Sequence, residues 1–272
     1  MSAEGAASRH PGAEGQLTAG AALTLEGLTA GYDSRPVVNE VSITVAPGEI
    51  VSVVGPNGSG KSTLLKAVIG IVQVLGGRVR LDDQEITGWL PEDVARAGVG
   101  YVPQVDDVFP PLTVRENLEM GGYLLPTREV QSRLDEVVTV FPRLATMLGR
   151  RAGKISGGER KMLAMARAMM LHPRLFVLDE PTANLAPAVA SEVLEEHVRG
   201  LARRGATALI VEQRARAVLA ISDRTYVLAG GRLRMEGSPE ELRSSPQFVA
   251  SFLGGSAGVA DIVSESEPGS PP

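Results

Sequence analysis

The fold is decided by the stretch Gly55-Pro56-Asn57-Gly58-Ser59-Gly60-Lys61-Ser62. It matches the pattern G-x-x-x-x-G-K-[ST], with an apolar run, Ile50–Val54, before it and a helical pattern, Lys61–Gly70, at its end. Glycines let the backbone wrap closely around a phosphate with its N–H groups pointing inward. The first N–H groups of the following helix have no partner within the helix, so they attract anions. The stretch therefore predicts a phosphate-binding loop between a buried strand and a helix.

Two side chains at the end of this loop are expected to carry its chemistry. Lys61 would place a positive charge on the β- and γ-phosphates of a nucleotide, and Ser62 would offer its hydroxyl to Mg²⁺. The alternative, a glycine-rich turn without a ligand, is disfavoured because the motif and its context agree. The expected nucleotide-binding residues of the loop are Gly55, Pro56, Asn57, Gly58, Ser59, Gly60, Lys61, Ser62 and Thr63.

A second strand ends in two carboxylates. The apolar run Leu175–Leu178 is followed directly by Asp179 and Glu180. Asp179 would hold Mg²⁺, through water, because Mg²⁺ favours few protein carboxylates and several waters. Glu180 would orient the attacking water and accept its proton as a general base. The alternative is a strand followed by an ordinary capping acid, and the phosphate loop upstream argues against it.

The pattern of the whole chain predicts an α/β fold. Strand and helix patterns alternate on both sides of residues 105–157, which favours a mostly parallel sheet covered by helices on both faces. The patterns of the chain include a strand at Val99–Val102 and helices at Thr127–Val140, Pro187–Arg204 and Arg214–Ile221. Near the N-terminus, Leu23–Ala30 and Val37–Val45 alternate apolar and polar residues and predict an antiparallel β portion. Residues 105–157 contain several prolines and helical patterns, with a capping box at Thr113 and Glu116, and predict a helical subdomain inserted into the core.

Composition sets the outer limits. Of the 272 residues, we expect 21–253 to form one nucleotide-binding domain, with disordered tails at 1–20 and 254–272. The formal net charge of −5 is not that of a nucleic-acid-binding protein, which usually has a basic stripe. The chain contains no cysteine, which excludes disulfides and thiolate metal sites. No stretch is long and apolar enough to cross a bilayer, and residues 1–20 lack the apolar core of a secretory signal.

A third motif precedes another helical pattern. Ile155-Ser156-Gly157-Gly158-Glu159-Arg160 presents a hydroxyl and bare N–H groups at a helix start, which suits either a second anion site or a plain helix cap. The order of phosphate loop, S-G-G-E and an apolar strand ending in Asp-Glu resembles the ATP-binding cassette (ABC) ATPase family over about 23–253. The resemblance implies a P-loop NTPase core of ABC type in which two such domains sandwich two ATP molecules. It also implies that Ser156, Gly157, Gly158 and Glu159 contact the γ-phosphate held by the partner domain.

The resemblance implies roles for further single residues. Tyr32 lies where the family has an aromatic residue that stacks on adenine, although an ordinary strand-end tyrosine is the alternative. Gln104 matches the glutamine that reaches Mg²⁺ and the water, with a solvated loop glutamine as the alternative. Gln213 stands where the family usually has a histidine that contacts the γ-phosphate. Glutamine can donate a hydrogen bond there but cannot carry a proton. The catalytic residues expected are therefore Glu180, Gln213 and Lys61.

Three segments narrow the resemblance to one subfamily. Val211-Glu212-Gln213, Asn184-Leu185-Ala186-Pro187 and Glu116–Gly122 resemble the ATPase subunits of branched-chain amino acid importers, whose relatives import amides and urea. This resemblance implies four kinds of partner: ATP, a second nucleotide-binding subunit in a homo- or heterodimer, integral membrane permease subunits, and an extracytoplasmic solute-binding protein. It places the chain at the cytoplasmic face of the cell membrane. The alternative is a non-transport ABC ATPase that serves as an assembly scaffold or acts on nucleic acid.

Overall fold

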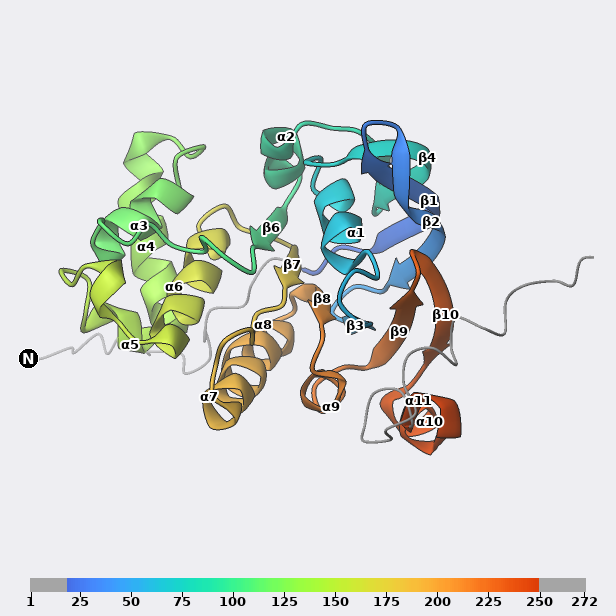
Figure 1. Cartoon of the computed structure of the whole chain (residues 1–272). Coiled ribbons are helices and arrows are strands. Elements are labelled where there is room, and N and C mark those ends of the chain that lie inside the picture. The colour runs from blue at the N-terminus through green and yellow to red at the C-terminus, as the bar shows by residue number, and fades with distance from the viewer. Residues whose placement is uncertain (1–18, 250–272) are drawn as a thin grey trace, which may run out of the picture.

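The computed structural model describes residues 19–249, and the rest of both expected tails lies outside the described residues. Two sheets and a group of helices make up this part of the chain (Figure 1). The first sheet has the order β2-β1-β4-β5 with antiparallel pairing throughout, which confirms the predicted antiparallel β portion. Its strands are β1 Leu23–Tyr32, β2 Arg35–Val45, β4 Gln73–Leu81 and β5 Gln84–Glu85.

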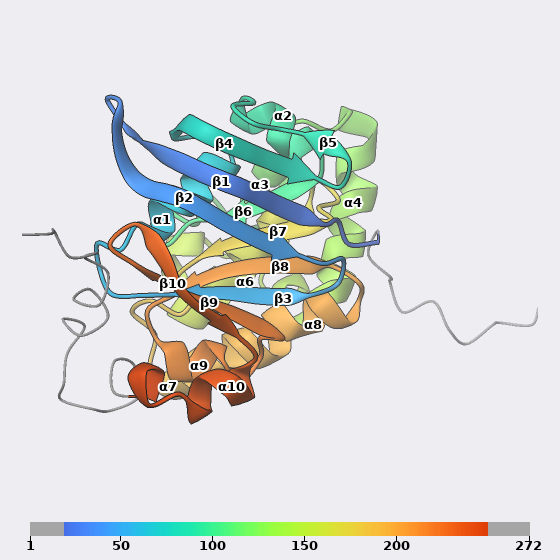
Figure 2. The same ribbon diagram turned by 90° about the vertical axis from the view of Figure 1, so that its right-hand side faces the viewer.

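The second sheet is the core of the molecule. Its order is β10-β9-β3-β8-β7-β6, and every pair is parallel except β10 with β9 (Figure 2). The central strands β3, β7 and β8 are buried along their whole length, which explains their continuous apolar runs. The mostly parallel sheet is thus confirmed. Its strands are β3 Ile50–Val54, β6 Val99–Val102, β7 Leu175–Asp179, β8 Thr207–Glu212, β9 Arg224–Ala229 and β10 Arg232–Gly237.

Helices outside the insertion pack around this sheet. The single helix expected over residues 187–204 is present, but its middle six residues adopt the wider π-helical form. The helix expected from Arg214 is shorter than its pattern suggested, and a C-terminal helical pair was not predicted. The elements are α1 Lys61–Val68, α2 Pro91–Arg96, α7 Pro187–Glu192, η2 Val193–Val198, α8 Arg199–Arg203, α9 Ala215–Val218, α10 Pro239–Ser244 and α11 Pro246–Phe248.

The predicted helical subdomain stands beside the sheet, next to β6 (Figure 1). The expected capping box is formed: Thr113 Oγ1 accepts from the Glu116 N–H at 3.1 Å, and the Thr113 N–H donates to Glu116 Oε2 at 2.7 Å. Within residues 19–249, none of the helices combines the length and apolar character needed to cross a bilayer. The subdomain consists of α3 Val114–Gly121, α4 Thr127–Val140, α5 Pro142–Ala145 and the 3₁₀ turn η1 Ala152–Lys154. Helix α6 Gly157–Met169 begins where the predicted insertion of residues 105–157 ends.

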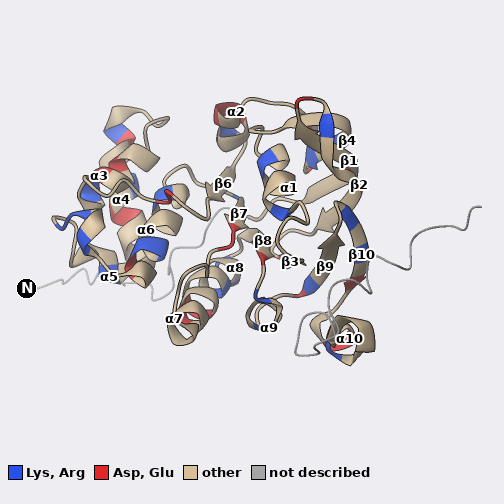
Figure 3. Ribbon diagram, viewed as in Figure 1, with Lys and Arg blue, Asp and Glu red and all other residues tan. Residues whose placement is uncertain are grey.

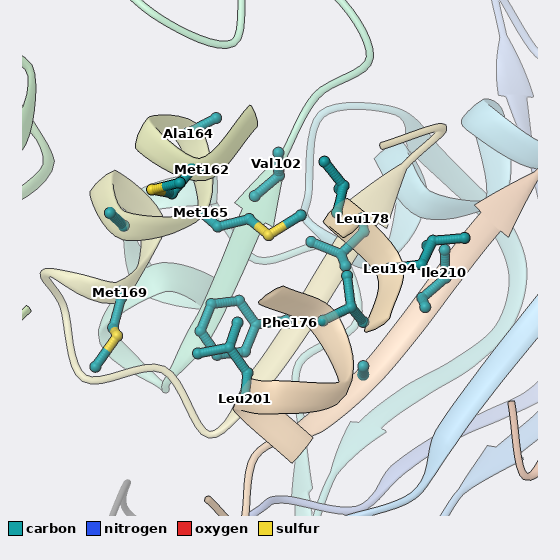
Figure 4. Close-up of a cluster of buried hydrophobic side chains, with 14 of the residues drawn as sticks. Val102, Met162, Ala164, Met165, Met169, Phe176, Leu178, Leu194, Leu201 and Ile210 are labelled. Carbon is teal, nitrogen blue, oxygen red and sulfur yellow. The ribbon is translucent and has the colours of Figure 1, made fainter. Parts of the chain in front are cut away.

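Helix α6 joins the subdomain to the sheet through a shared core. Met162, Met165 and Met169 are buried on one face of α6 and belong to the same apolar cluster as Phe176 and Leu178 of β7 (Figure 4). Methionine fills such irregular gaps because it is unbranched and flexible. The opposite face of the parallel sheet packs on α1 and the antiparallel sheet in a second cluster. The phosphate loop and α6 are therefore attached to the same rigid sheet.

Candidate active site

The predicted phosphate loop lies at the carboxyl end of β3 and leads into α1. Gly58 and Gly60 have φ values of 77° and 102°, in the left-handed region that favours glycine. At Gly55 the limit is space, since a Cβ there would lie 2.2 Å from the carbonyl oxygen of Leu228. Glycine is therefore favoured at Gly58 and Gly60 by backbone conformation and at Gly55 by the lack of space for a side chain.

A pocket of about 400 Å³ opens above this loop. It collects side chains from five separate parts of the chain: the loop with the start of α1, the segments that follow β6, β7 and β8, and the first residues of β2, an edge strand of the first sheet. These segments meet because β3, β8, β7 and β6 are parallel neighbours. The residues lining the pocket are Val37, Asn57, Gly58, Gly60, Lys61, Ser62, Thr63, Gln104, Glu180 and Gln213.

Lys61 lies almost completely inside the protein, with 5% of its surface exposed. Its ammonium donates to the carbonyl oxygens of Gly55 at 2.9 Å and Pro56 at 3.1 Å, and lies 3.7 Å from Glu180 Oε1. Burial lowers the pKa of Lys61, while the charges of Glu180 and Asp179 oppose that shift. The ammonium is thus held at the rim of the loop, beside the pocket.

Asp179 ends β7 and is 2% exposed. Its Oδ1 accepts from the Ser62 hydroxyl at 3.0 Å, and its Oδ2 accepts from the Tyr101 hydroxyl at 3.4 Å. Burial raises the pKa of Asp179, and the Ser62 hydrogen bond and the charge of Lys66 oppose the rise. Burial also raises the pKa of Tyr101, as does the negative charge of Asp179. The two expected metal-binding residues of the loop and β7 are therefore in direct contact.

Glu180 follows Asp179 with a backbone that points its side chain into the pocket. Its φ of 44° lies in the left-handed region, a strain of about 1–3 kcal/mol that is typical of functional sites. The backbone is held there by a 3.0 Å hydrogen bond from the Glu180 N–H to the Val211 carbonyl. Gln104 donates its side-chain amide to Glu180 Oε2 at 2.8 Å. Gln104, Glu180 and Lys61, predicted from three distant motifs, thus form one cluster.

Gln213 reaches the pocket from the end of β8, next to a buried carboxylate that the sequence did not single out. Glu212 is 2% exposed, and its Oε1 accepts from the Thr182 N–H at 2.9 Å and hydroxyl at 2.7 Å. Burial raises the pKa of Glu212, and these hydrogen bonds oppose the rise. Glu212 therefore ties the end of β8 to the loop that follows Glu180.

Ser156, Gly157, Gly158 and Glu159, the motif expected to contact a partner's γ-phosphate and called the signature from here on, lie apart from this pocket, since none of them lines it. Ser156 caps α6: its N–H donates to Glu159 Oε2 at 2.8 Å, and its Oγ accepts from the Glu159 N–H at 3.3 Å. A Cβ on Gly157 would lie 2.9 Å from Leu185, and one on Gly158 would lie 2.7 Å from Val189. The glycines therefore allow the start of α6 to pack against Leu185 and the first turn of α7.

Tyr32 is also outside the pocket. It ends β1 and is 49% exposed, so its ring is open to contact with another molecule.

Pro56 and Ser59 form the back of the phosphate loop, where the Pro56 carbonyl accepts a hydrogen bond from the Ser59 N–H at 3.2 Å. The sequence-derived set therefore divides into a pocket cluster, the exposed Tyr32 and the signature at the start of α6.

The residues present fit a nucleotide phosphate and a hard cation. Within the loop, Ser59 Oγ is buried without a hydrogen-bond partner among the described residues, so the loop contains an unsatisfied polar atom as it stands. The loop's N–H groups and the start of α1 form the kind of concave site that binds phosphate. Ser62, Asp179 and Gln104 offer side-chain oxygens. Mg²⁺ prefers oxygen ligands, and in nucleotide sites it binds a few protein oxygens together with the substrate's phosphates.

Several contacts of this site involve residues that we did not predict. Val37 lines the pocket, Tyr101 contacts Asp179, Glu212 holds Thr182, and Lys161 of α6 donates to the Gln104 carbonyl at 2.9 Å. Glu212 had a detectable signal, because a carboxylate at the end of an apolar strand has the same pattern as Asp179. The other three depend on contacts between distant segments.

Known proteins resemble this chain over most of its length. Residues 38–183 match the family model described as "ABC transporter". The ATP-binding protein BraG for high-affinity branched-chain amino acid transport of Pseudomonas aeruginosa is 39% identical, covering 86% of this chain and all of BraG. The probable branched-chain amino acid transport ATP-binding protein LivF of Archaeoglobus fulgidus is 40% identical over 84% of this chain and 96% of LivF.

Other similar proteins carry different names. The lipopolysaccharide export system ATP-binding protein LptB of Haemophilus influenzae is 34% identical, covering 85% of this chain and 97% of LptB. Among solved structures, the ADP conformation of MJ1267, an ATP-binding cassette of an ABC transporter, is 29% identical with a TM-score of 0.77, covering 84% of this chain and 97% of that one. The chain therefore belongs to the ABC transporter family and is the ATPase subunit of a transporter.

Proposed function

We propose that this ATPase drives an importer of branched-chain amino acids or of related small polar solutes such as amides and urea. The observation that carries the proposal is the 39% identity to BraG across the whole length of that protein. LivF supports the same cargo class with 40% identity. The segment Val211-Glu212-Gln213, with glutamine in place of the family's usual histidine, points to the same subfamily.

In this proposal Glu180 is the general base of ATP hydrolysis. Its carboxylate lines the pocket, and the Gln104 amide fixes Oε2 at 2.8 Å. Oε1, which lies 3.7 Å from the Lys61 ammonium, would accept a proton from water. Lys61 and Gln213 stabilise charge on the γ-phosphate. Ser62, Asp179 and Gln104 would hold Mg²⁺, which neutralises phosphate charge when bound.

The signature completes the site of a second nucleotide-binding subunit. Ser156, Gly157, Gly158 and Glu159 start α6 outside their own chain's pocket. The N–H groups of Ser156 and Glu159 serve the capping box, so in this proposal the N–H groups of Gly157 and Gly158 would bind the partner's phosphate. Tyr32, half exposed at the end of β1, would stack on adenine. A dimer of nucleotide-binding subunits would thus form two composite ATP sites.

A groove between the sheet and the helical subdomain offers a docking place for the permease. It has a volume of about 330 Å³ and lies between α2 and β6 on one side and α3 and α6 on the other. Ile71, Met120 and Tyr123 line it and are 55%, 47% and 69% exposed. A permease segment with an apolar face would cover them, at the cytoplasmic face of the membrane. The extracytoplasmic solute-binding protein would act through that permease.

The catalytic part of the proposal is tested with Glu180→Gln. We expect ATP turnover to fall by roughly 10²–10³-fold while ATP binding, followed by calorimetry, is retained, because the variant keeps the shape of the side chain but not its basicity. Glu85→Gln, an exposed carboxylate on β5, is the matched control and should hydrolyse ATP like the wild type. Equal turnover in the wild type and Glu180→Gln would remove Glu180 from the catalytic role.

The cargo is tested in proteoliposomes that contain the subunit with the permease purified from the same membranes. Leucine presented with its binding protein should stimulate ATP hydrolysis. A complex that responds to urea or amides instead would place the cargo in the related class.

LptB, at 34% identity, supports an export role as the second candidate, and a lipid-exporting permease in the purified complex would favour it. Figure 3 shows acidic and basic residues interspersed over both sheets and the helical subdomain, which does not favour the nucleic-acid alternative.

A further inference from the structure

Lys161, a buried residue of α6, binds the loop that begins with Gln104. The Lys161 ammonium donates to the Gln104 carbonyl at 2.9 Å and lies 2.8 Å from Asp107 Oδ2. The Lys161 side chain is 6% exposed and that of Asp107 is 14% exposed, so water competes little with these contacts. Lys161 itself does not line the nucleotide pocket.

Gln104, which Lys161 binds, also donates a hydrogen bond to Glu180, the proposed general base. Gln104 is bound at its backbone by Lys161 and, through its side chain, donates to Glu180 Oε2 at 2.8 Å. A shift of the Gln104 backbone would therefore carry its amide away from Glu180. Lys161 controls one of the contacts that fix the orientation of that carboxylate.

The other end of the same loop is fixed as well. The Arg167 guanidinium lies over the Phe109 ring, 4.9 Å from its centroid. Asn117 accepts from the Phe109 N–H at 2.7 Å and donates to its carbonyl at 3.1 Å. Residues 104–109 are thus attached to α6 at Lys161 and Arg167, and to α3 at Asn117. Helix α6 begins directly after Ser156, so the helix that starts with the signature also contains Lys161, which binds Gln104.

We propose that Lys161 is a positioning residue for ATP hydrolysis, which holds the Gln104 amide on Glu180 and makes the signature helix and the 104–109 loop move as one unit. The inference rests on the proposed role of Glu180 as general base. Through this contact, a displacement of the start of α6 by a second subunit would be transmitted to the Gln104 amide. The rate of ATP hydrolysis would then depend on the position of α6 relative to the core sheet.

The competing explanation is that Lys161 only stabilises the fold. A buried ion pair is weak evidence for stability, because apolar residues of similar size often replace one without loss. The chain offers a matched cation for comparison: Arg133 of α4, also 6% exposed, donates to the Met170 carbonyl at 3.3 Å, contacts the Met169 carbonyl and pairs with Glu136 at 2.6 Å. Arg133 therefore holds the other end of α6 without any contact to the site.

The test compares Lys161→Met with Arg133→Met in the full chain, by two measurements. Hydrogen exchange in the absence of nucleotide should quicken in the peptide covering residues 103–109 for Lys161→Met only. Steady-state hydrolysis should show kcat about tenfold lower for Lys161→Met with KM for ATP nearly unchanged, because misplacement of a positioned group lowers turnover rather than binding. Lys161→Gln, which keeps a donor for the Gln104 carbonyl, should recover part of kcat.

A double variant shows whether Lys161 acts through Gln104. In a Gln104→Ala background, Lys161→Met should cause no further loss of kcat, since the amide that it positions is gone. Additive losses, equal losses in Arg133→Met, or unchanged exchange at residues 103–109 would overturn the proposal.

If Lys161→Met does not fold, Lys161→Gln and the double variant Lys161→Met/Asp107→Leu, which leaves no unpaired charge, give the same readouts. A failure of Glu180→Gln to lower turnover would instead contradict the proposed general base.

Discussion

Gln104 donates a 2.8 Å hydrogen bond from its side-chain amide to Glu180 Oε2. The two residues follow β6 and β7, which are parallel neighbours in the core sheet. The loop that begins with Gln104 leads into the helical subdomain, whereas Glu180 leads to α7. The bond therefore joins the proposed catalytic carboxylate to the part of the chain expected to contact a permease.

Loss of this bond should lower turnover. In Gln104→Ala we expect kcat for ATP to fall about tenfold, because Glu180 loses the donor that orients it, while KM changes little. Steady-state hydrolysis across a range of ATP concentrations measures both quantities. Gln84→Ala on the exposed strand β5 should match the wild type. A rise in KM with unchanged kcat would mean that Gln104 serves binding instead.

Packing at the phosphate loop predicts an effect on stability. Gly55→Ala should lower the free energy of unfolding by about 1–3 kcal/mol, because the added Cβ would lie 2.2 Å from the Leu228 carbonyl oxygen. Gly149→Ala is the matched control, since no atom lies within 4 Å of its added Cβ. That control should be neutral or slightly stabilising. Urea unfolding of both variants measures the difference, and equal effects would show that the Gly55 backbone relaxes freely.

The regular elements whose sequence signal is local were predicted well. Ile50–Val54, Val99–Val102 and Thr127–Val140 have the bounds expected from their apolar runs or helical period. Strand β10 was not predicted, because Arg232–Gly237 alternates charged residues with half-buried Leu233 and Met235 at the sheet edge. Pairing with β9 makes it a strand, and that pairing is a tertiary contact.

The site shows the same division. The phosphate loop and the Asp179-Glu180 pair are contiguous motifs, so their residue types and order were sufficient to predict them. Lys161 belongs to no such motif, since in the sequence it is one charged residue within a helical pattern. Its partner Gln104 is 57 positions away in the chain, and only the folded sheet brings the two together. Contacts of this kind have no signal in a single sequence.

The start of α6 should show two separable roles for Ser156. Ser156→Ala should lower the free energy of unfolding by about 1 kcal/mol through loss of the helix cap, and should also reduce ATP turnover if the signature serves a partner subunit. Thr113→Ala removes the same type of capping box from α3 and should cost similar stability. Its turnover should remain that of the wild type. Equal turnover losses in the two variants would assign the effect of Ser156→Ala to capping alone.

A half-buried histidine should make stability depend on pH. His197 packs edge-on against Phe141, with ring centroids 5.8 Å apart, and burial lowers its pKa below the ordinary value of about 6.5. As pH falls through about 6.5, the unfolded chain binds this proton first, so the free energy of unfolding decreases toward the lower folded-state pKa. Urea unfolding between about pH 7.5 and 5.5 should show this slope in the wild type.

The variant His197→Phe keeps the aromatic contact but cannot titrate, so its stability should fall less over the same pH range. Burial also lowers the pKa of His172, which contributes a slope of the same sign. His197→Phe should therefore flatten the wild-type profile in part, and replacing His172 as well should flatten it further. Identical slopes in the wild type and His197→Phe would mean that the His197 ring binds its proton as readily in the folded protein as in the unfolded chain.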